Sequence, residues 1–171
     1  ILSANLTIHL NDGSGTFVAA GRHYPSWGLI EVGEELGMVA VGSLDADPLP
    51  DLAVASTGTD EVWVLRNLGP DSGWASQALP AGDTPFGAAT ADLDQDGAEE
   101  VLVTNGGSHD LWIHSQTGPA TWGEPEVLPV GGLEPGFVGQ GDLDGDGRTD
   151  LVTSNHSSSE VAVFLANGSS F

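Results

Sequence analysis

The sequence contains no cysteine among its 171 residues, which excludes disulfide bonds and thiol catalysis. It also contains no lysine, and only three arginines (Arg22, Arg66 and Arg148) stand against 25 acidic residues. The formal net charge of −22 would repel nucleic acid and anionic membranes, so neither is an expected partner. No stretch approaches the roughly 18 apolar residues of a transmembrane helix, so no membrane insertion is expected.

Several other signals are missing. GxSxG, Walker and dinucleotide-binding motifs are absent, and the five histidines share no H-x-x-x-H spacing. No signal peptide opens the chain, and residues 1–5 look like the middle of a repeat, so we expect a processed or truncated chain. No segment of helical length keeps a 3.6-residue apolar period, whereas glycine is abundant. The composition is that of a sheet protein, and the length indicates one domain.

An acidic loop at residues 141–151, GDLDGDGRTDL, is the strongest motif. Its aspartates are Asp142, Asp144, Asp146 and Asp150. Because like charges packed this closely repel one another, a hard divalent cation is the expected neutraliser. Ligands that are all oxygen suit Ca²⁺ better than zinc or copper. The alternative is an acidic surface turn without an ion.

The loop recurs twice, as ADLDQDGAEEV at residues 91–101 and as GSLDADPLPDL at residues 42–52. Each copy follows a segment of small residues and precedes an apolar strand, a polar turn and an alternating strand. The alternating strands are expected at residues 61–65, 110–113 and 160–164. A period of about 50 residues with four short strands per unit indicates a β-propeller or a related array rather than a β-sandwich.

The order of these elements resembles a known repeat. A small-residue strand, D-x-D-x-D-G-x-x-D-L, a further strand and V-x-V-x-x-N-x-G-x-x-F are similar to the FG-GAP/VCBS repeat of integrin α-subunits and many bacterial extracellular proteins. The resemblance covers nearly the whole chain. It implies an all-β fold, a propeller of usually seven four-stranded blades, with calcium in the hairpin loop between the first and second strands of a blade.

The resemblance also implies the ligands of two calcium ions. In the third loop they are the side chains of Asp142, Asp144, Asp146 and Asp150 and the carbonyl of Arg148. In the second loop they are the side chains of Asp92, Asp94, Asp96 and Glu100 and the carbonyl of Ala98. Glu100 stands where the family has aspartate. Its extra methylene changes how the carboxylate would reach the ion but keeps its charge. An ion is therefore expected in both loops.

The first loop departs further from the pattern. Ser43 replaces the leading aspartate, and Pro48 replaces the turn glycine. Proline fixes φ near −65° and cannot reach the left-handed region. The remaining ligands, which predict a weaker third site, are Asp45, Asp47, Asp51 and the carbonyl of Leu49.

An EF-hand shares the opening D-x-D-x-D-G and is the main competing motif. It requires a bidentate glutamate at the twelfth loop position, where this chain has Val103 and Thr153, and helices on both sides. Strands are expected on both sides here, so the EF-hand is excluded.

Counting units gives about 3.5 repeats within a single domain, residues 1–171. The units are residues 1–36 (partial), 37–85, 86–135 and 136–171 (partial). Joining the two ends into one blade would duplicate a third strand. Three arrangements stay open: a homodimer that closes a seven-bladed ring, a fragment of a longer propeller, and a compact four-bladed variant.

The expected function is adhesion or recognition of a protein or glycan by a calcium-stabilised module that is not an enzyme. Extracellular modules of this kind hold calcium at roughly 10⁻⁴–10⁻³ M, which predicts an extracellular, secreted, periplasmic or cell-surface location. A lectin with repeated sugar pockets is one alternative. A propeller hydrolase or lyase is the other, and it rests on polar residues that do not recur in the repeats: Arg22, His23, Tyr24, Glu31, Glu34 and Glu35.

Overall fold

The computed structural model describes residues 5–7, 9–11, 13–19, 30–45 and 47–167. Within these ranges all regular structure is β-strand, which confirms the all-β prediction. No helix that could cross a membrane is found in this described part of the chain.

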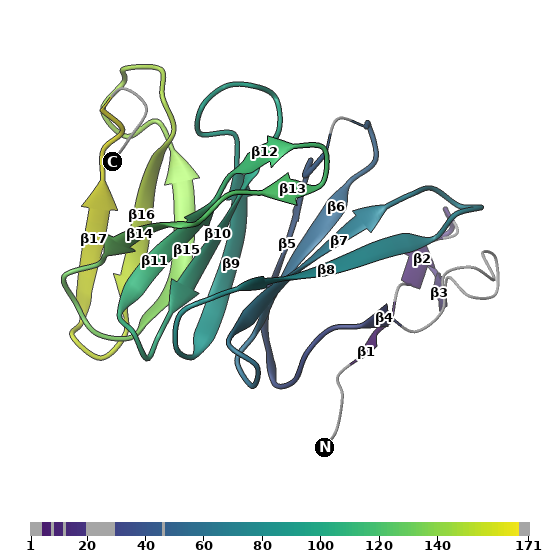
Figure 1. The fold of residues 1–171 in the computed structure, drawn as a ribbon, viewed down its shortest axis with the longest axis horizontal. Coiled ribbons are helices and arrows are strands. Elements are labelled where there is room, and N and C mark those ends of the chain that lie inside the picture. Colours follow the sequence, from purple (N-terminus) through teal and green to yellow (C-terminus); the bar gives the residue numbers. More distant parts are fainter. Residues whose placement is uncertain (1–4, 8, 12, 20–29, 46, 168–171) are drawn as a thin grey trace.

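Three antiparallel meanders, here called blades, stand side by side in sequence order (Figure 1). Blade A consists of β5 (Leu36–Gly42), β6 (Asp51–Ser56), β7 (Glu61–Asn67) and β8 (Trp74–Pro80). Blade B consists of β9 (Pro85–Ala91), β10 (Glu100–Asn105), β11 (Asp110–His114) and β14 (Glu126–Pro129). Blade C consists of β15 (Pro135–Gly141), β16 (Asp150–Asn155) and β17 (Glu160–Phe164). Blades A and B confirm the predicted four-stranded unit.

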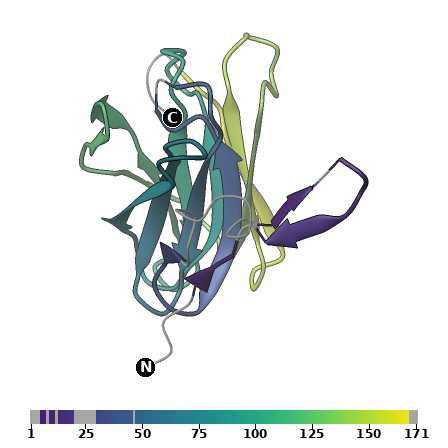
Figure 2. The same cartoon turned by 90° about the vertical axis from the view of Figure 1, so that its right-hand side faces the viewer.

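The other strands form two-stranded sheets. They are β1 (Asn5–Leu6) with β4 (Ile30–Glu31), β2 (His9–Asn11) with β3 (Phe17–Ala19), and β12 (Gln116–Gly118) with β13 (Thr121–Trp122). The β12–β13 hairpin is inserted between the third and fourth strands of blade B and projects to one side of the sheets (Figure 2). It contacts blade A, because Gln116 Nε2 donates a hydrogen bond to the Leu44 carbonyl at 2.7 Å and Trp122 packs on the core between blades A and B. The repeat spacing did not predict this insertion.

The apolar core lies between the blades because alternate residues of each strand point to opposite faces. Val62 and Val64 of blade A pack with Val101 and Val103 of blade B, and all four are fully buried or nearly so. The next interface buries Leu111 and Ile113 of blade B against Val138 and Leu151 of blade C. Each interface between blades is therefore built from apolar strand residues in the same way, as the sequence repeat leads one to expect.

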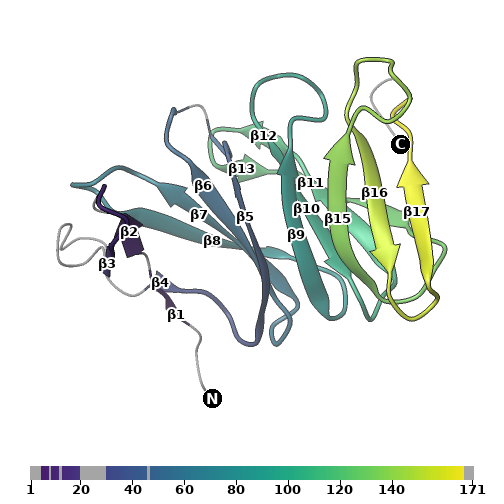
Figure 3. The same cartoon turned by 180° about the vertical axis from the view of Figure 1, so that it is seen from behind.

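The first strands, β5, β9 and β15, lie next to one another and join the blades (Figure 3). Thr90 Oγ1 donates a hydrogen bond to the Val41 carbonyl at 3.4 Å, and Gln140 Nε2 donates to the Thr90 carbonyl at 3.1 Å. These three residues occupy equivalent positions in successive first strands. Glycine permits the close approach, since a Cβ at Gly37 would overlap the Phe86 carbonyl and a Cβ at Gly87 would overlap the Gly136 carbonyl.

Blade C presents an uncovered face. Val161 and Val163 of β17 are 65% and 52% exposed, whereas the equivalent residues of β11, Leu111 and Ile113, are 0% and 3% exposed. The difference arises because blade C covers β11, while no described segment packs on β17 in the same way.

The backbone repeats as well. Glu35, Thr84 and Glu134, each just before a first strand, have φ of 49°, 57° and 52°, although none is glycine. Their carbonyls accept hydrogen bonds from Thr57, Gly106 and His156, respectively, in the turn after the second strand. Glu34 and Glu35 thus belong to the repeated linker, which corrects their assignment to the residues that do not recur. Arg22, His23 and Tyr24 lie outside the described residues.

His114 is a buried histidine in blade B and provides a pH-dependent prediction. Burial lowers its pKa to about 4, against the opposing effect of a hydrogen bond to the Pro80 carbonyl. Because the unfolded chain binds a proton near pH 6.5 and the folded chain does not, the stability that neutral His114 contributes is lost as the pH falls from 6.5 towards 4. This loss is about 3 kcal/mol.

Replacing His114 with leucine, the residue at the equivalent position 65 of β7, should remove this loss. Urea unfolding at pH 8 and pH 4.5 measures it. The drop in unfolding free energy between the two pH values should be smaller by about 2.5 kcal/mol in His114→Leu than in the wild type, because pH 4.5 is still above the pKa of the folded state. The pH 8 values isolate the packing effect of the substitution, and equal drops in the two proteins would contradict the prediction.

Candidate metal centre

The three acidic loops connect the first and second strands of their blades and lie at the same end of the array. They are residues 43–50, 92–99 and 142–149. Direct hydrogen bonds join neighbouring loops. Glu99 N donates to the Ser43 carbonyl at 2.9 Å, and Gln95 Nε2 donates to the Gly147 carbonyl at 3.1 Å. The loops are therefore held in a row rather than moving independently.

The third loop gathers its first three acids. Carboxylate oxygens of Asp142, Asp144 and Asp146 lie within 4.8 Å of one another, and all three residues are exposed. Asp142 accepts hydrogen bonds from Gly145 N at 2.7 Å and Gly147 N at 3.0 Å. These bonds require the sharp turn that Gly147, with φ of 86°, provides.

The second loop gathers a different trio. Asp92, Asp94 and Glu100 offer oxygens within 4.8 Å of one another, while Asp96 is not part of this group. Asp92 Oδ2 accepts a hydrogen bond from Gly97 N at 3.2 Å. Its other oxygen, Oδ1, is buried and has no hydrogen-bond partner among the described residues. A buried carboxylate oxygen without a donor is an open ligand position for a cation.

The aspartate that begins the second strand anchors the preceding loop in blades A and C. Asp150 is fully buried and accepts hydrogen bonds from Leu143 N at 2.7 Å and Ala166 N at 2.8 Å. Asp51 does the same with Leu44 N at 3.0 Å and Asn67 N at 2.8 Å. Each carboxylate therefore ties its loop to the end of the third strand.

The anchoring acids differ in their proton affinity. The hydrogen bonds from Ala166 and Leu143 lower the pKa of Asp150, whereas burial raises the pKa of Asp51 despite the hydrogen bond from Asn67. Glu100 receives one backbone hydrogen bond, from Leu93 N at 2.8 Å, because its longer side chain reaches into the acidic cluster instead.

Burial is the main cause that raises the pKa of Glu100 to about 7, and the neighbouring Asp94 and Asp92 add to it. A cation beside Glu100 would favour its charged form and lower this pKa. The ion-free second loop therefore carries an electrostatic cost that a bound cation would relieve.

The first loop lacks this convergence. Asp45, Asp47 and Asp51 form no cluster of the kind found in the other two loops of the described chain. Two substitutions in the first loop explain this difference. In the second and third loops, the leading aspartate accepts a hydrogen bond from the backbone N–H of the turn glycine. Ser43 offers no carboxylate there, and Pro48 offers no N–H.

The residues of the second and third loops fit a hard divalent cation. Each loop brings three carboxylates together, and hydrogen bonds from backbone N–H groups two residues further along the chain orient aspartates of both loops. A calcium ion takes six to eight oxygen ligands. The further ligands expected from the sequence, the carbonyls of Ala98 and Arg148 and the side chains of Asp96 and Asp150, are not part of the convergent trios.

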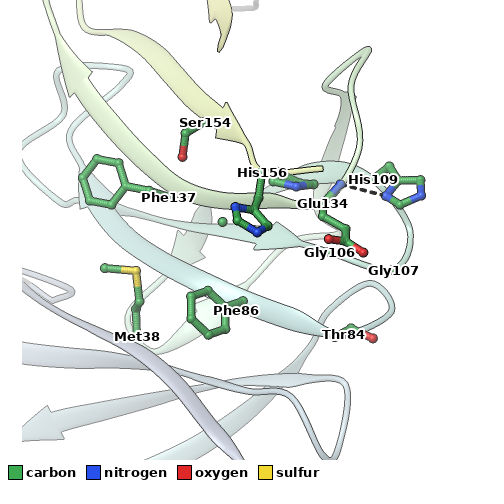
Figure 4. A pocket seen from close by; sticks show the side chains of 12 residues that line it. Met38, Thr84, Phe86, Gly106, Gly107, His109, Glu134, Phe137, Ser154 and His156 are labelled. Atoms are coloured by element: carbon green, nitrogen blue, oxygen red, sulfur yellow. Dashed lines mark hydrogen bonds between the residues drawn. The ribbon is translucent and has the colours of Figure 1, made fainter. Parts of the chain in front are cut away.

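A groove lies at the opposite end of the array from the loops, where β9 and β15 begin (Figure 4). Its volume is about 640 Å³, and its apolar lining includes Met38, Phe86 and Phe137. The two phenylalanines are 50% and 52% exposed. His109, Glu134 and His156 lie towards its polar side. His109 Nδ1 accepts a hydrogen bond from Glu134 N at 3.2 Å, which fixes its imidazole.

The acidic motif did not predict this groove. The available signal was a large aromatic residue near the start of two first strands that otherwise consist mainly of small residues. The hydrogen bonds of Gln95 and Glu99 between loops, and the anchoring role of Asp51 and Asp150, were missed because they depend on how neighbouring blades pack.

Comparison with known families gives one match. A family model described as FG-GAP-like repeat matches residues 44–103 and 92–153. Each matched range begins at an acidic loop and ends in or near the second strand of the following blade. No curated protein matched the chain.

Proposed function

The chain belongs to the FG-GAP-like repeat family, and on this premise we propose that it is a calcium-stabilised recognition module of the extracellular space. The observation that carries the calcium part is the convergence of three carboxylates in each of two equivalent loops. Calcium would be structural, because its protein ligands leave little room for a substrate. The module is proposed to bind a protein partner rather than to catalyse a reaction.

Calcium would act by removing the repulsion within each loop. Without the ion, the carboxylates of Asp142, Asp144 and Asp146 repel one another across less than 4.8 Å. With the ion, they become attractive ligands and fix the hairpin that joins the first two strands. The modest affinity of such sites, roughly 10⁻⁴–10⁻³ M, is useful where calcium is abundant, which supports the extracellular assignment.

Alanine substitutions in two loops test the assignment of the ligands. Asp144→Ala removes a member of a convergent trio and should weaken calcium binding at the third loop at least tenfold, which corresponds to about 1.4 kcal/mol. Asp45→Ala removes an acid of the loop without convergence and should leave calcium binding unchanged. Isothermal titration calorimetry with CaCl₂ measures both, and equal effects of the two variants would contradict the assignment.

The groove supports the recognition part of the proposal. Phe86 and Phe137 expose about half of their surface there, and large exposed aromatic side chains in a concave site are typical anchors of protein interfaces. Glu134 lies at the polar side of the groove, and the whole chain is strongly acidic. A partner segment with an apolar anchor and basic flanking residues matches this surface best.

Peptide display on the calcium-loaded protein tests this choice of partner. Selected peptides should combine an apolar anchor with arginine or lysine, and Phe86→Ser with Phe137→Ser should weaken their binding at least tenfold. Val127→Ser is the matched control, since Val127 is 47% exposed on the outer strand β14, away from the groove. Binding to a glycan array that survives the double substitution, without peptide binding, would favour a lectin and contradict the proposal.

A further inference from the structure

Arg66 is a basic residue beside the first acidic loop, at a strand position that is not basic in the other blades. Arg148, 4.0 Å from Asp146 Oδ2, belongs to the third loop itself, and its side chain is more exposed than that of Arg66. Arg66 follows Leu65 in β7, and the residues at the equivalent positions are Ser115 after β11 and Leu165 after β17. Arg66 Nη1 lies 3.9 Å from Asp45 Oδ2, and the two side chains are 28% and 15% exposed. The blade without a convergent carboxylate trio is therefore the blade that carries an arginine at this position.

The surroundings of Arg66 are acidic. It lines a cleft of about 940 Å³ together with Asp45 and Asp47 of the first loop and Asp96 of the second. A guanidinium carries a permanent charge and five N–H donors, so it can neutralise carboxylates without a ligand from solution. The same charge repels a divalent cation that approaches the loop.

The other changes in the first loop are consistent with neutralisation of its acids by Arg66 rather than by a cation. The leading carboxylate and the turn N–H, which bond to each other in the second and third loops, are both absent because Ser43 and Pro48 replace their residues. The anchoring acid is retained, since Asp51 keeps both of its backbone hydrogen bonds. The loop has lost the features suited to an ion and has kept those that fasten it to its blade.

We propose that Arg66 takes the place of calcium in blade A, so that the first loop is formed at any calcium concentration. This inference rests on the proposed function, because it assumes that the equivalent loops of blades B and C hold calcium. It identifies blade A as the calcium-independent part of the array and confines the response to calcium to blades B and C.

Rebuilding the first loop tests the inference. Ser43→Asp with Pro48→Gly restores the leading carboxylate and the turn N–H. With Arg66 in place, calcium titration should give the same stoichiometry as the wild type, and adding Arg66→Met should then raise it by one ion per chain. Thr117→Met in place of Arg66→Met is the control, since Thr117 is an uncharged residue that lines the same cleft, and it should add no ion. A further ion in the double variant that retains Arg66, or none in the folded triple variant, would overturn the inference.

A measurement in EDTA separates this inference from the proposed function. Arg66→Met leaves the acids of the first loop unneutralised and should lower the melting temperature without calcium by about 2–4 °C, more than Thr117→Met does. Equal shifts for the two variants would overturn the role of Arg66, even if the rebuilt loop fails to fold. A wild type that binds no calcium would overturn the proposed function and leave the EDTA comparison of the two variants valid.

Discussion

Removal of calcium with EDTA is expected to lower the melting temperature of the protein by roughly 10–20 °C relative to a calcium concentration about 100 times the dissociation constant. An ion that binds only the folded chain at this excess contributes about 2.7 kcal/mol, and two such loops contribute about 5 kcal/mol. The physical source is the convergence of Asp92, Asp94 and Glu100 in one loop and of Asp142, Asp144 and Asp146 in the next. Differential scanning fluorimetry with and without EDTA measures the shift.

Two controls distinguish specific binding from a general salt effect. Magnesium at the same concentration should restore little of the stability, because it demands a smaller octahedral shell and gives up water reluctantly. A variant with both Asp94→Ala and Asp144→Ala should show no more than about half of the wild-type shift, because a site weakened tenfold still contributes about 1.4 kcal/mol at this calcium concentration. An unchanged melting temperature of the wild type in EDTA would show that these loops do not depend on a metal.

Substitution of Gly87 with alanine is expected to destabilise the protein by about 3 kcal/mol, at the upper end of the usual cost of overpacking. A Cβ at this position would overlap both Thr104 Oγ1 and the backbone carbonyl of Gly136 in the next blade. It would also disturb the 3.0 Å hydrogen bond that Gly87 N donates to Thr104 Oγ1. Because the Gly136 backbone cannot move without the rest of β15, blades B and C would have to separate.

Gly136→Ala is the matched control. It lies in the neighbouring first strand, and a Cβ there would meet no heavy atom within 4 Å. Its unfolding free energy should stay within about 0.5 kcal/mol of the wild type. Chemical unfolding curves of both variants decide the matter, and similar stabilities would show that the blades are not in tight contact at Gly87.

The sequence predicted those parts of the fold that depend on local pattern. The apolar run of residues 101–103 and the alternating run of residues 110–113 became β10 and β11 because period-2 patterns and turn residues act locally. The β12–β13 hairpin was missed because Trp122 occupies the repeat position of Trp74, yet Trp74 begins the outer strand β8 whereas Trp122 lies in the inserted hairpin. Glu34 and Glu35 were assigned to the residues that do not recur, because the repeat there lies mainly in the backbone φ angles and in hydrogen bonds to the carbonyls, and only Glu134 repeats the side chain of Glu35.

The sequence was sufficient to predict which loops form the candidate site, but not which carboxylates converge in each loop. The D-x-D-x-D-G spacing located the acids of the second and third loops. Both Glu100 and Asp96 were predicted as ligands of the second loop, whereas only Glu100 joins the convergent trio with Asp92 and Asp94. Arg66 was invisible to the motif because it lies 21 residues after Asp45 in the chain and reaches it only through the pairing of β6 with β7.

The joint between first strands has a consequence for how such arrays diversify. Thr90 and Gln140 are different residues, yet each donates to a main-chain carbonyl at the same position of the preceding blade. Because every residue type supplies that carbonyl, a donor can mutate without a compensating change in its neighbour. A duplication of one unit copies the donor and the acceptor of the joint together, so the array can gain or lose whole blades without the evolution of a new interface.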